Sequence, residues 1–254
     1  MASLITGASS GLGAALALDL AREGETLHLS GRDAARLGAV AAACRAQGAT
    51  VHEAVLDVTD AASMQAWIEA AGQLRLVIAN AGISAGTGAA VEPAEQVRAI
   101  FATNVTGVLN TVLPALATMA RQAPGLDGVR GRVAVIASIA AFVAAPGAPA
   151  YCASKAAVQR WAEAMDASER RRGIRVHAIC PGYVRTPMTA ANAFPMPFLM
   201  EPEAAARRTL AGIARGRVRV AFPWPLYAGA RFAAALPPSW QRVLLGRVPA
   251  KAAG

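Results

Sequence analysis

The chain has 254 residues, of which 55% are hydrophobic and 16% charged, and its formal net charge at pH 7 is +9. This length suits one large α/β domain or two small ones, each with an ample core. The first charged residue is Asp19, so no basic segment precedes an apolar one and a secretory signal is not expected. The three cysteines and three histidines lack metal-binding or redox spacing. We therefore assign no metal and expect a cytoplasmic protein with free thiols.

Strand and helix patterns alternate along the chain with short breaks between them. Strands are expected at 3–6, 26–30, 50–56, 76–79, 132–138 and 175–180, with a short seventh at 217–221. Helices are expected near 12–23, 34–47, 60–72, 93–121, 152–172 and 202–214. This alternation predicts a parallel sheet covered on both faces. Because parallel crossovers are right-handed, the predicted fold is a single-domain α/β protein with a Rossmann-type doubly wound sheet of seven strands.

Residues 133–154 carry no charge and could be mistaken for a membrane span. Ser138, Pro146, Gly147 and Pro149 interrupt this stretch, and its β-rich start fits a buried strand. A spanning helix is therefore not expected here. A second irregular stretch, residues 182–202, is rich in Pro, Met and Phe and is expected to form a mobile substrate flap.

A glycine-rich sequence, TGASSGLG at residues 6–13, joins the first expected strand to a helix with apolar Leu12, Leu16 and Leu20. Glycines suit a turn that must approach a pyrophosphate closely, and a helix N-terminus offers free N–H groups and a positive dipole end. This spacing differs from the common G-x-G-x-x-G dinucleotide fingerprint. Its position between a strand and an amphipathic helix nevertheless indicates a dinucleotide site.

Tyr151 and Lys155 form a second candidate group. The chain has 23 arginines and two lysines, Lys155 and Lys251, so a lysine four residues after a tyrosine suggests chemistry that a guanidinium cannot do. On a helix these positions share a face, and an ammonium near a phenol lowers the pKa of the phenol. The alternative is a surface Tyr and Lys on a helix.

In these motifs and several others, the chain resembles the short-chain dehydrogenase/reductase superfamily, in its compact single-domain branch, over residues 1 to about 222. The resemblance depends on several motifs in the same order as in that family. They are residues 6–13, Asp57, the Asn80-Ala81-Gly82 sequence, Asn104, Ser138, Tyr151 with Lys155, and Pro181-Gly182 followed by Thr186. One small departure is Ala79, where the family often has a second Asn.

The resemblance implies four catalytic residues. Tyr151 would be the general acid of carbonyl reduction and Ser138 would hold the same substrate oxygen by a hydrogen bond. Lys155 would bind the nicotinamide ribose and lower the pKa of Tyr151, and Asn104 would hold a water that links Lys155 to solvent. Ser138 could instead cap the loop after its strand, and Asn104 could instead bond to the backbone.

The end of the second strand indicates the cofactor. Gly31 leaves room for a phosphate and Arg32 suits a bidentate contact with it, so NADP is favoured over NAD. Asp33, an acid beside this position, is expected to cap the next helix. By the resemblance, Asp57 and Val58 would flank the adenine. The cofactor would also contact Gly7, Ser9, Ser10, Gly11, Leu12, Gly13, Arg32, Asn80, Ala81 and Gly82 (the last three at the adenosine ribose), Tyr151, Lys155, Pro181, Gly182, Val184 and Thr186.

The expected substrate region comprises residues 140–150, Tyr183 and residues 189–200. It is largely apolar, and Arg185 is the one cation that obviously faces it. We therefore expect a hydrophobic ketone, aldehyde or secondary alcohol rather than a small anion. Its apolar residues could instead simply pack the flap: Phe142, Val143, Ala144, Phe194, Met196, Phe198, Leu199 and Met200.

The whole net charge lies in the tail. Residues 1–203 hold 16 basic and 16 acidic side chains, whereas residues 204–254 hold nine basic side chains and no acid. We divide the chain into a catalytic domain at 1–222 and a basic, aromatic extension at 223–254 that packs on or near it. This extension could cover the substrate pocket or a neighbouring subunit, contact a membrane surface, or attract an acidic partner such as an acyl carrier. No nucleic-acid reading element accompanies the charge, so nucleic acid is not expected.

The sequence therefore predicts an NADP-dependent oxidoreductase, a carbonyl reductase that transfers a hydride between NADPH and a hydrophobic substrate. A homodimer or homotetramer is expected, through the helices at 93–121 and 152–172. The alternatives are a non-catalytic nucleotide sensor or scaffold, and a lipid-modifying reductase at the membrane periphery.

Overall fold

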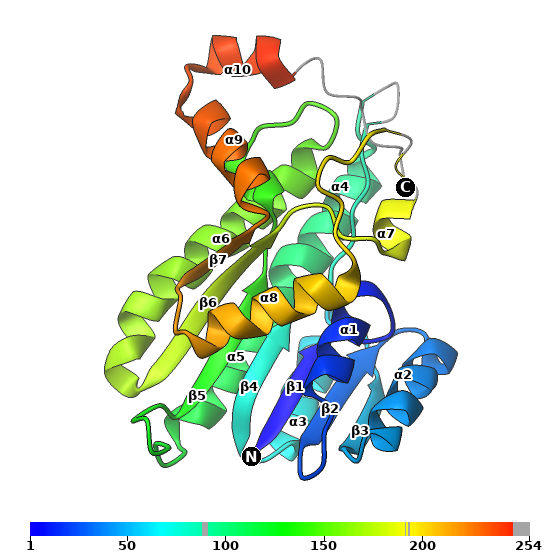
Figure 1. Ribbon diagram of the computed structural model, residues 1–254, viewed down its shortest axis with the longest axis vertical. Coiled ribbons are helices and arrows are strands. Elements are labelled where there is room, and N and C mark those ends of the chain that lie inside the picture. Colours follow the sequence, from blue (N-terminus) through cyan, green and yellow to red (C-terminus); the bar gives the residue numbers. More distant parts are fainter. Residues whose placement is uncertain (88–90, 191, 193, 246–254) are drawn as a thin grey trace.

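Seven parallel strands form one sheet between two layers of helices in the computed structural model (Figure 1). The structure describes residues 1–87, 91–190, 192 and 194–245. The strand order is β3-β2-β1-β4-β5-β6-β7, which confirms the predicted doubly wound sheet. Each predicted strand overlaps one of the observed ones: β1 Ala2–Thr6, β2 Thr26–Gly31, β3 Thr50–Val55, β4 Leu74–Ala79, β5 Gly131–Ile136, β6 Ile174–Pro181 and β7 Arg219–Phe222.

The two faces of the sheet bury two separate hydrophobic cores. Successive side chains of a strand point to opposite faces, so Ile5 joins the core under α1, α2 and α8, whereas Leu4 joins the core under α3, α5 and α6. These helices are α1 Gly11–Leu20, α2 Ala34–Ala46, α3 Ala61–Ala70, α5 Gly107–Ala120, α6 Pro149–Glu169 and α8 Pro202–Ala214. The sheet is thus packed on both faces, and the carboxyl ends of its parallel strands lie along one edge.

The prediction of one continuous helix over 93–121 is wrong in one respect. The structure divides it into α4 Ala94–Phe101, a π-helical turn at Ala102–Thr106, and α5. Gly107 follows the turn and lies against Val58, where an added Cβ would be 2.5 Å from Val58 Cγ2. Single π-turns inserted in a helix are common near functional sites.

The uncharged stretch 133–154 contains three different elements. It runs through β5, the 3-10 helix η2 Ile139–Phe142 and the first turns of α6, in agreement with the prediction that it is no spanning helix. Pro149 lies in the first turn of α6, a favoured position for proline, so this helix starts three residues before the predicted 152. Tyr151 is therefore inside the helix. Among the described residues, Ala94–Ala120 is long and apolar enough to cross a membrane, but core helices pass the same test.

Beyond β7, the chain forms α9 Trp224–Ala235 and α10 Pro238–Leu245, which extend past the carboxyl end of the sheet (Figure 1). α9 packs against η2 and β7, and Ala230 is buried in the core under α6. Trp224, Phe232 and Trp240 are exposed. Arg247 and Lys251 of the basic tail lie outside the described residues. The division of the chain at residue 222, and the membrane or subunit contact of the tail, stay predictions.

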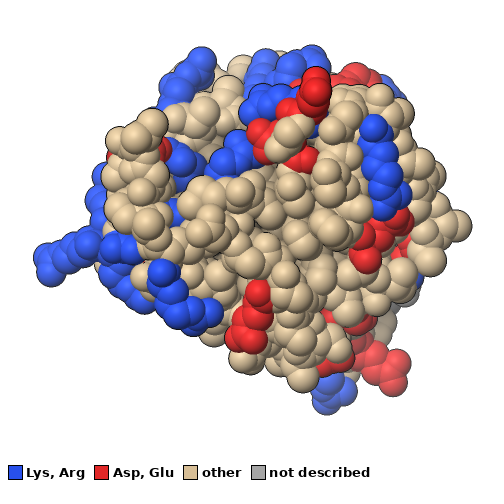
Figure 2. Space-filling view, turned by 90° about the horizontal axis from the view of Figure 1, so that it is seen from below, with Lys and Arg blue, Asp and Glu red and all other residues tan. Residues whose placement is uncertain are grey.

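Figure 2 shows the opposite end of the molecule, at the amino ends of the strands, where basic and acidic side chains both lie on the surface. Glu25, near this end, pairs with Arg22 at 3.0 Å and with Arg75 at 2.5 Å. The balanced charge of residues 1–203 thus includes direct ion pairs between neighbouring elements. The cavity that contains Tyr151 and Lys155 lies at the other end of the sheet.

Candidate active site

A cavity of about 850 Å³ lies at the carboxyl ends of the strands, where the order reverses between β1 and β4. Ligands of doubly wound sheets bind at this switch point, and the volume is in the range of small-molecule sites. Every cofactor-binding residue expected from the sequence lines this cavity, and so does Ser138. Asn104 does not line it.

The glycine-rich turn after β1 forms the floor of the cavity. Gly7 and Gly11 have φ angles of +65° and +55°, in the left-handed region that favours glycine. A Cβ on Gly13 would lie 2.2 Å from the carbonyl oxygen of Gly7, so this position has no room for a side chain. Ser10 begins α1 without a side-chain capping bond, which leaves first-turn N–H groups available to an anion. This cradle fits the pyrophosphate of a dinucleotide.

Asn80 braces this turn from the end of β4. Its Nδ2 donates to the carbonyl oxygens of Thr6 and Gly7, both at 3.0 Å. In return, the Thr6 hydroxyl accepts hydrogen bonds from the N–H groups of Asn80 and Ala81, at 3.0 and 3.1 Å. The Asn80 side chain therefore holds the glycine turn in place. Asn80 also lines the cavity, and its place beside the adenosine ribose stays a prediction.

Ser138 and Tyr151 meet at the inner end of the cavity. Ser138 follows β5, and its Oγ accepts a hydrogen bond from the Ala140 N–H at 3.1 Å as the N-cap of η2. The same side chain forms a hydrogen bond with the Tyr151 hydroxyl. The interpretation of Ser138 as a loop cap therefore applies, and its predicted hydrogen bond to the substrate oxygen stays a prediction.

Lys155 lies one helical turn after Tyr151, with its Nζ 5.9 Å from the centroid of the tyrosine ring. The ammonium donates to the carbonyl oxygen of Ile136 at 2.8 Å, and the residue is 4% exposed. This arrangement confirms that the two side chains share one face of α6 and rules out the alternative of a surface pair.

Burial is the largest cause of the pKa shifts of Tyr151 and Lys155. It raises the pKa of Tyr151 to about 12, more than the hydrogen bond from Ser138 lowers it. Burial also lowers the pKa of Lys155 to about 8. The expectation that Lys155 lowers the pKa of Tyr151 below its ordinary value is therefore wrong for this structure. The phenol keeps its proton at neutral pH, as a general acid must.

Asn104 lies in the π-helical turn and is completely buried. Its Oδ1 accepts from the Ile83 N–H at 2.8 Å, and its Nδ2 donates to the Ile83 carbonyl at 2.9 Å and to Ser154 Oγ at 3.1 Å. The side chain thus ties the loop after β4 to α6, next to Lys155. This geometry favours the interpretation of Asn104 as an Asn bonded to backbone. Its link to a water stays a prediction.

The adenosine end of the cavity carries two guanidinium groups. Arg32 is 68% exposed and lies 4.0 Å from the Asp57 carboxylate, a separation at which a surface ion pair contributes little. Asp33 accepts from the Arg36 N–H at 2.9 Å, which confirms that it caps α2. Arg36 also lines the cavity and was missed from the sequence. The sequence did offer a signal for Arg36, because it lies in the first turn of a helix that begins at this edge of the sheet.

Most of the residues expected to contact the substrate lie outside the cavity lining. Phe142 is buried and packs edge-on against Tyr227 at 5.2 Å, so it belongs to the core rather than to the expected pocket wall. Tyr183 and Phe194 contact each other edge-on at 6.2 Å. Arg185, the expected cation of this region, pairs with Glu201 at 2.8 Å. Of the expected substrate segments, Thr189 reaches the cavity, together with its neighbours Pro187 and Met188.

Comparison with known proteins identifies the family. The chain matches the short chain dehydrogenase family over residues 2–194, so it belongs to this family. It is 42% identical over 242 residues to a protein named uncharacterized oxidoreductase from Myxococcus xanthus, with 92% of each chain covered. The chain is therefore an oxidoreductase of this family, as the motifs in the sequence indicated.

Solved structures of similar proteins have the same fold. A short-chain dehydrogenase from Sphingobium yanoikuyae in complex with NADPH superposes with a TM-score of 0.80 at 27% identity, covering 98% of this chain and 96% of the other. A short chain dehydrogenase/reductase from Burkholderia phymatum in complex with NAD has the same fold, with a TM-score of 0.81 at 24% identity, covering 100% of this chain and 97% of the other. These neighbours bind nicotinamide dinucleotides of both kinds.

The glycine cradle leads to a direct test. We expect Gly13→Ala to weaken cofactor binding by about 10-fold or more, because its methyl group would force the turn open and displace N–H groups that face the pyrophosphate. Isothermal titration with NADPH and NADH measures this loss. Gly38→Ala in α2 is the matched control, because its added methyl meets only Glu53 Oε2 at 3.5 Å. Equal affinity in both variants would contradict the cradle.

Proposed function

We propose that the protein is an NADP-dependent carbonyl reductase for hydrophobic substrates. The observation that carries this proposal is the half-buried Tyr151 phenol, hydrogen-bonded to Ser138 and one helical turn from Lys155, inside the cavity that also contains the glycine cradle. A protein that only senses nucleotides would not need to bury a phenol and an ammonium here, since burial of ionisable groups is costly.

The chain's own residues handle the proton and the developing charge. When bound, reduced nicotinamide supplies a hydride to the carbonyl carbon. The Tyr151 hydroxyl would give its proton to the carbonyl oxygen as that carbon is reduced, so that the product is a neutral alcohol. Ser138 would hold the same oxygen in the buried site, where a hydrogen bond to developing charge is strong. The Lys155 ammonium would stabilise the phenolate that Tyr151 becomes.

Three features support NADP as the cofactor. Gly31 presents no side chain, and Arg32 is exposed and weakly paired. Two acids lie nearby: Asp33 is engaged in capping α2 and in an ion pair with Arg36 at 2.7 Å, and Asp57 accepts hydrogen bonds from the Thr59 N–H and hydroxyl. A guanidinium pair at this edge suits the 2′-phosphate that distinguishes NADP from NAD. The hydrophobic substrate, the cytoplasmic location and the homo-oligomer remain part of this proposal, on the residues and the family alone.

The proposal depends first on Tyr151. We expect Tyr151→Phe to lower the rate of ketone reduction by about 10²–10⁴-fold, the usual contribution of a positioned acid, while the dissociation constant of NADPH changes by less than about two-fold. Loss of NADPH absorbance with aliphatic, aromatic and steroidal ketones measures turnover. Lys155→Ala should impair both binding and turnover. A Tyr151→Phe variant with full activity would reject the assigned acid.

The pH dependence follows from the two buried groups. Because the Lys155 pKa is lowered to about 8, its ammonium is present below that pH and is lost above it. We expect kcat/KM for NADPH to fall as the pH rises through about 8, with Tyr151 still protonated because its pKa is about 12. Oxidation of the alcohol should instead accelerate with pH, since it needs the phenolate. Lys155→Arg keeps its charge, so any residual activity should lack the fall near pH 8. A flat wild-type profile from pH 7 to 10 would contradict this assignment.

Cofactor choice is tested at Arg32. We expect Arg32→Ala to weaken NADPH binding by about 10-fold, the loss of a charge-assisted phosphate contact, and to leave NADH binding unchanged. Fluorescence titration with each cofactor measures both constants. Arg22→Ala, which alters an exposed guanidinium outside the cavity, is the control. Tighter binding of NADH than of NADPH by the unaltered protein would reject the choice of NADP.

A further inference from the structure

Arg219 of β7 joins three elements around the loop that follows Ser138. Its Nη1 donates to the Tyr227 hydroxyl of α9 at 2.9 Å, and its Nε forms an ion pair with Glu163 of α6. Its guanidinium carbon lies 5.2 Å from the centroid of the Phe142 ring, at the end of η2. The Arg219 side chain is 25% exposed and that of Glu163 is 17% exposed, so water screens this contact incompletely.

Phe142 is enclosed from several directions. The Tyr227 ring meets it edge-on at 5.2 Å, and the Arg231 guanidinium of α9 lies 5.8 Å from its centroid. Phe142 itself is 7% exposed. Cations over an aromatic face are attracted to it, more strongly when partly desolvated. The end of η2 at Phe142 is therefore held by β7 and α9.

The near end of η2 is Ser138. Its Oγ caps the first turn of η2 through Ala140 N–H and meets the Tyr151 hydroxyl. η2 has four residues, and such short 3-10 helices have poor internal hydrogen-bond geometry. Its position therefore depends on tertiary contacts at its ends. The contact of Arg219 with Phe142 is one 3-10 turn away from the oxygen that Ser138 presents to the substrate.

We propose that Arg219 is a positioning residue that, through Phe142 and Tyr227, fixes η2 so that Ser138 Oγ stays in line with the Tyr151 hydroxyl. The start of the C-terminal extension then supports the active site through η2, because Tyr227 of α9 completes the contact. This inference deepens the proposed carbonyl reduction and rests on it. A lysine could keep the charge but not the planar set of donors that reaches Glu163 and Tyr227 together.

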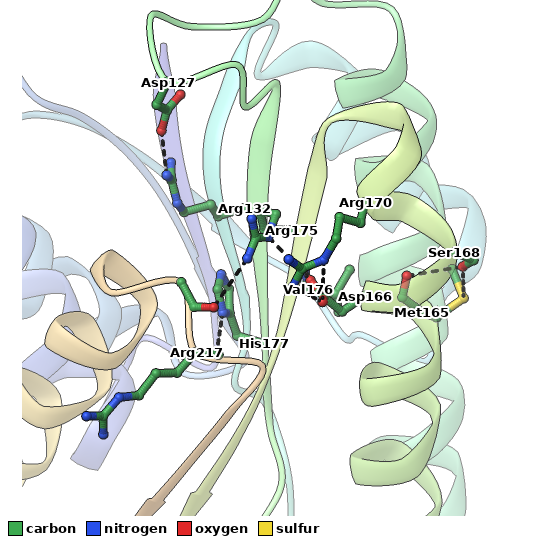
Figure 3. A network of polar contacts seen from close by, with 11 residues as sticks. Asp127, Arg132, Met165, Asp166, Ser168, Arg170, Arg175, Val176, His177 and Arg217 are labelled. Carbon is green, nitrogen blue, oxygen red and sulfur yellow. Dashed lines mark hydrogen bonds and ion pairs between the residues drawn. The ribbon is translucent and has the colours of Figure 1, made fainter.

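The chain offers a matched control in a second, partly buried ion pair. Arg175 of β6 lies 3.6 Å from Asp166 of α6, with side-chain exposures of 24% and 4% (Figure 3). It also joins a strand to α6, three residues nearer the amino end of the sheet than Ala178, the β6 partner of Arg219. Its network contains Arg170, His177 and the carbonyl of Arg217, and it has no contact with η2 in the part of the chain that the structure describes.

The experiment compares Arg219→Met with Arg175→Met in the full chain. We expect kcat for ketone reduction to fall by about 10-fold or more in Arg219→Met, since a small misplacement of an oriented donor has large effects on rate. The dissociation constant of NADPH should change by less than about two-fold. Arg175→Met should lose comparable thermal stability but keep kcat within about two-fold. Equal kcat values in the two variants would overturn the proposal.

Milder variants keep the proposal testable if Arg219→Met fails to fold. Tyr227→Phe removes one hydroxyl and keeps the ring against Phe142, so kcat should fall by about two- to five-fold. Arg219→Lys should lie between Arg219→Met and the unaltered protein. Phe142→Leu combined with Tyr227→Phe should lower kcat by less than the product of the single effects, because both act through one contact. Independent effects would count against a shared role.

Hydrogen–deuterium exchange of the backbone at residues 138–147 tests the positioning role of Arg219 separately from the proposed carbonyl reduction, because the measurement needs no turnover. In Arg219→Met this peptide should exchange at least about five-fold faster than in Arg175→Met, as a loop freed from its contacts does. If no ketone is reduced by the unaltered protein but this difference appears, the proposed reaction fails and the positioning of η2 stands. If exchange is equal in both variants, the role of Arg219 is rejected whatever the activity.

Discussion

Removal of two ionisable side chains from water is the constraint on which the rest of this site depends. Burial shifts the pKa of Tyr151 upward to about 12 and that of Lys155 downward to about 8, so two values that lie close together in water move apart. A phenol that keeps its proton can give it to a substrate, and an ammonium close to its titration point responds readily to new charge. The apolar core under α6 therefore has a chemical consequence as well as a structural one.

Such burial has to be compensated by hydrogen bonds, and the structure supplies them from several elements. The end of β5 provides the carbonyl of Ile136 for Lys155, and the next residues provide Ser138 for Tyr151. The π-helical turn lets Asn104 reach both Ile83 and Ser154, which joins the loop after β4 to the catalytic helix. None of these contacts is local in sequence. They exist because the parallel order brings the carboxyl ends of β4, β5 and β6 side by side.

This difference between local and non-local contacts decides what could be predicted from the sequence. The strands and the glycine turn were predictable because their periodicity and steric demands are local. The sign of the Tyr151 pKa shift was missed, since spacing reveals a lysine one turn away but not how deeply both groups are buried. The bonds of Asn80 to Thr6 and Gly7 could not be predicted for the same reason: the sequence shows a polar residue at a strand end, while its partners depend on the neighbouring strand. Phe142 was expected in a pocket, yet an apolar residue in a loop has no pattern that separates a pocket wall from a core.

Helix α6 is held at both ends, and this has a consequence for how changes are transmitted. Its 21 residues span about 30 Å. At its start the Ala150 N–H donates to Glu92 at 3.0 Å, and near its end Asp166 accepts from the Val176 N–H at 3.1 Å. A helix held at both ends has little freedom to tilt or slide. Loss of one tie, such as the ion pair of Arg175 with Asp166, leaves the Val176 hydrogen bond and the Arg170 ion pair in place, so the phenol at the opposite end keeps its position. In directed evolution of this protein, positions near the carboxyl end of α6 would therefore tolerate substitution without a change in stereochemical preference.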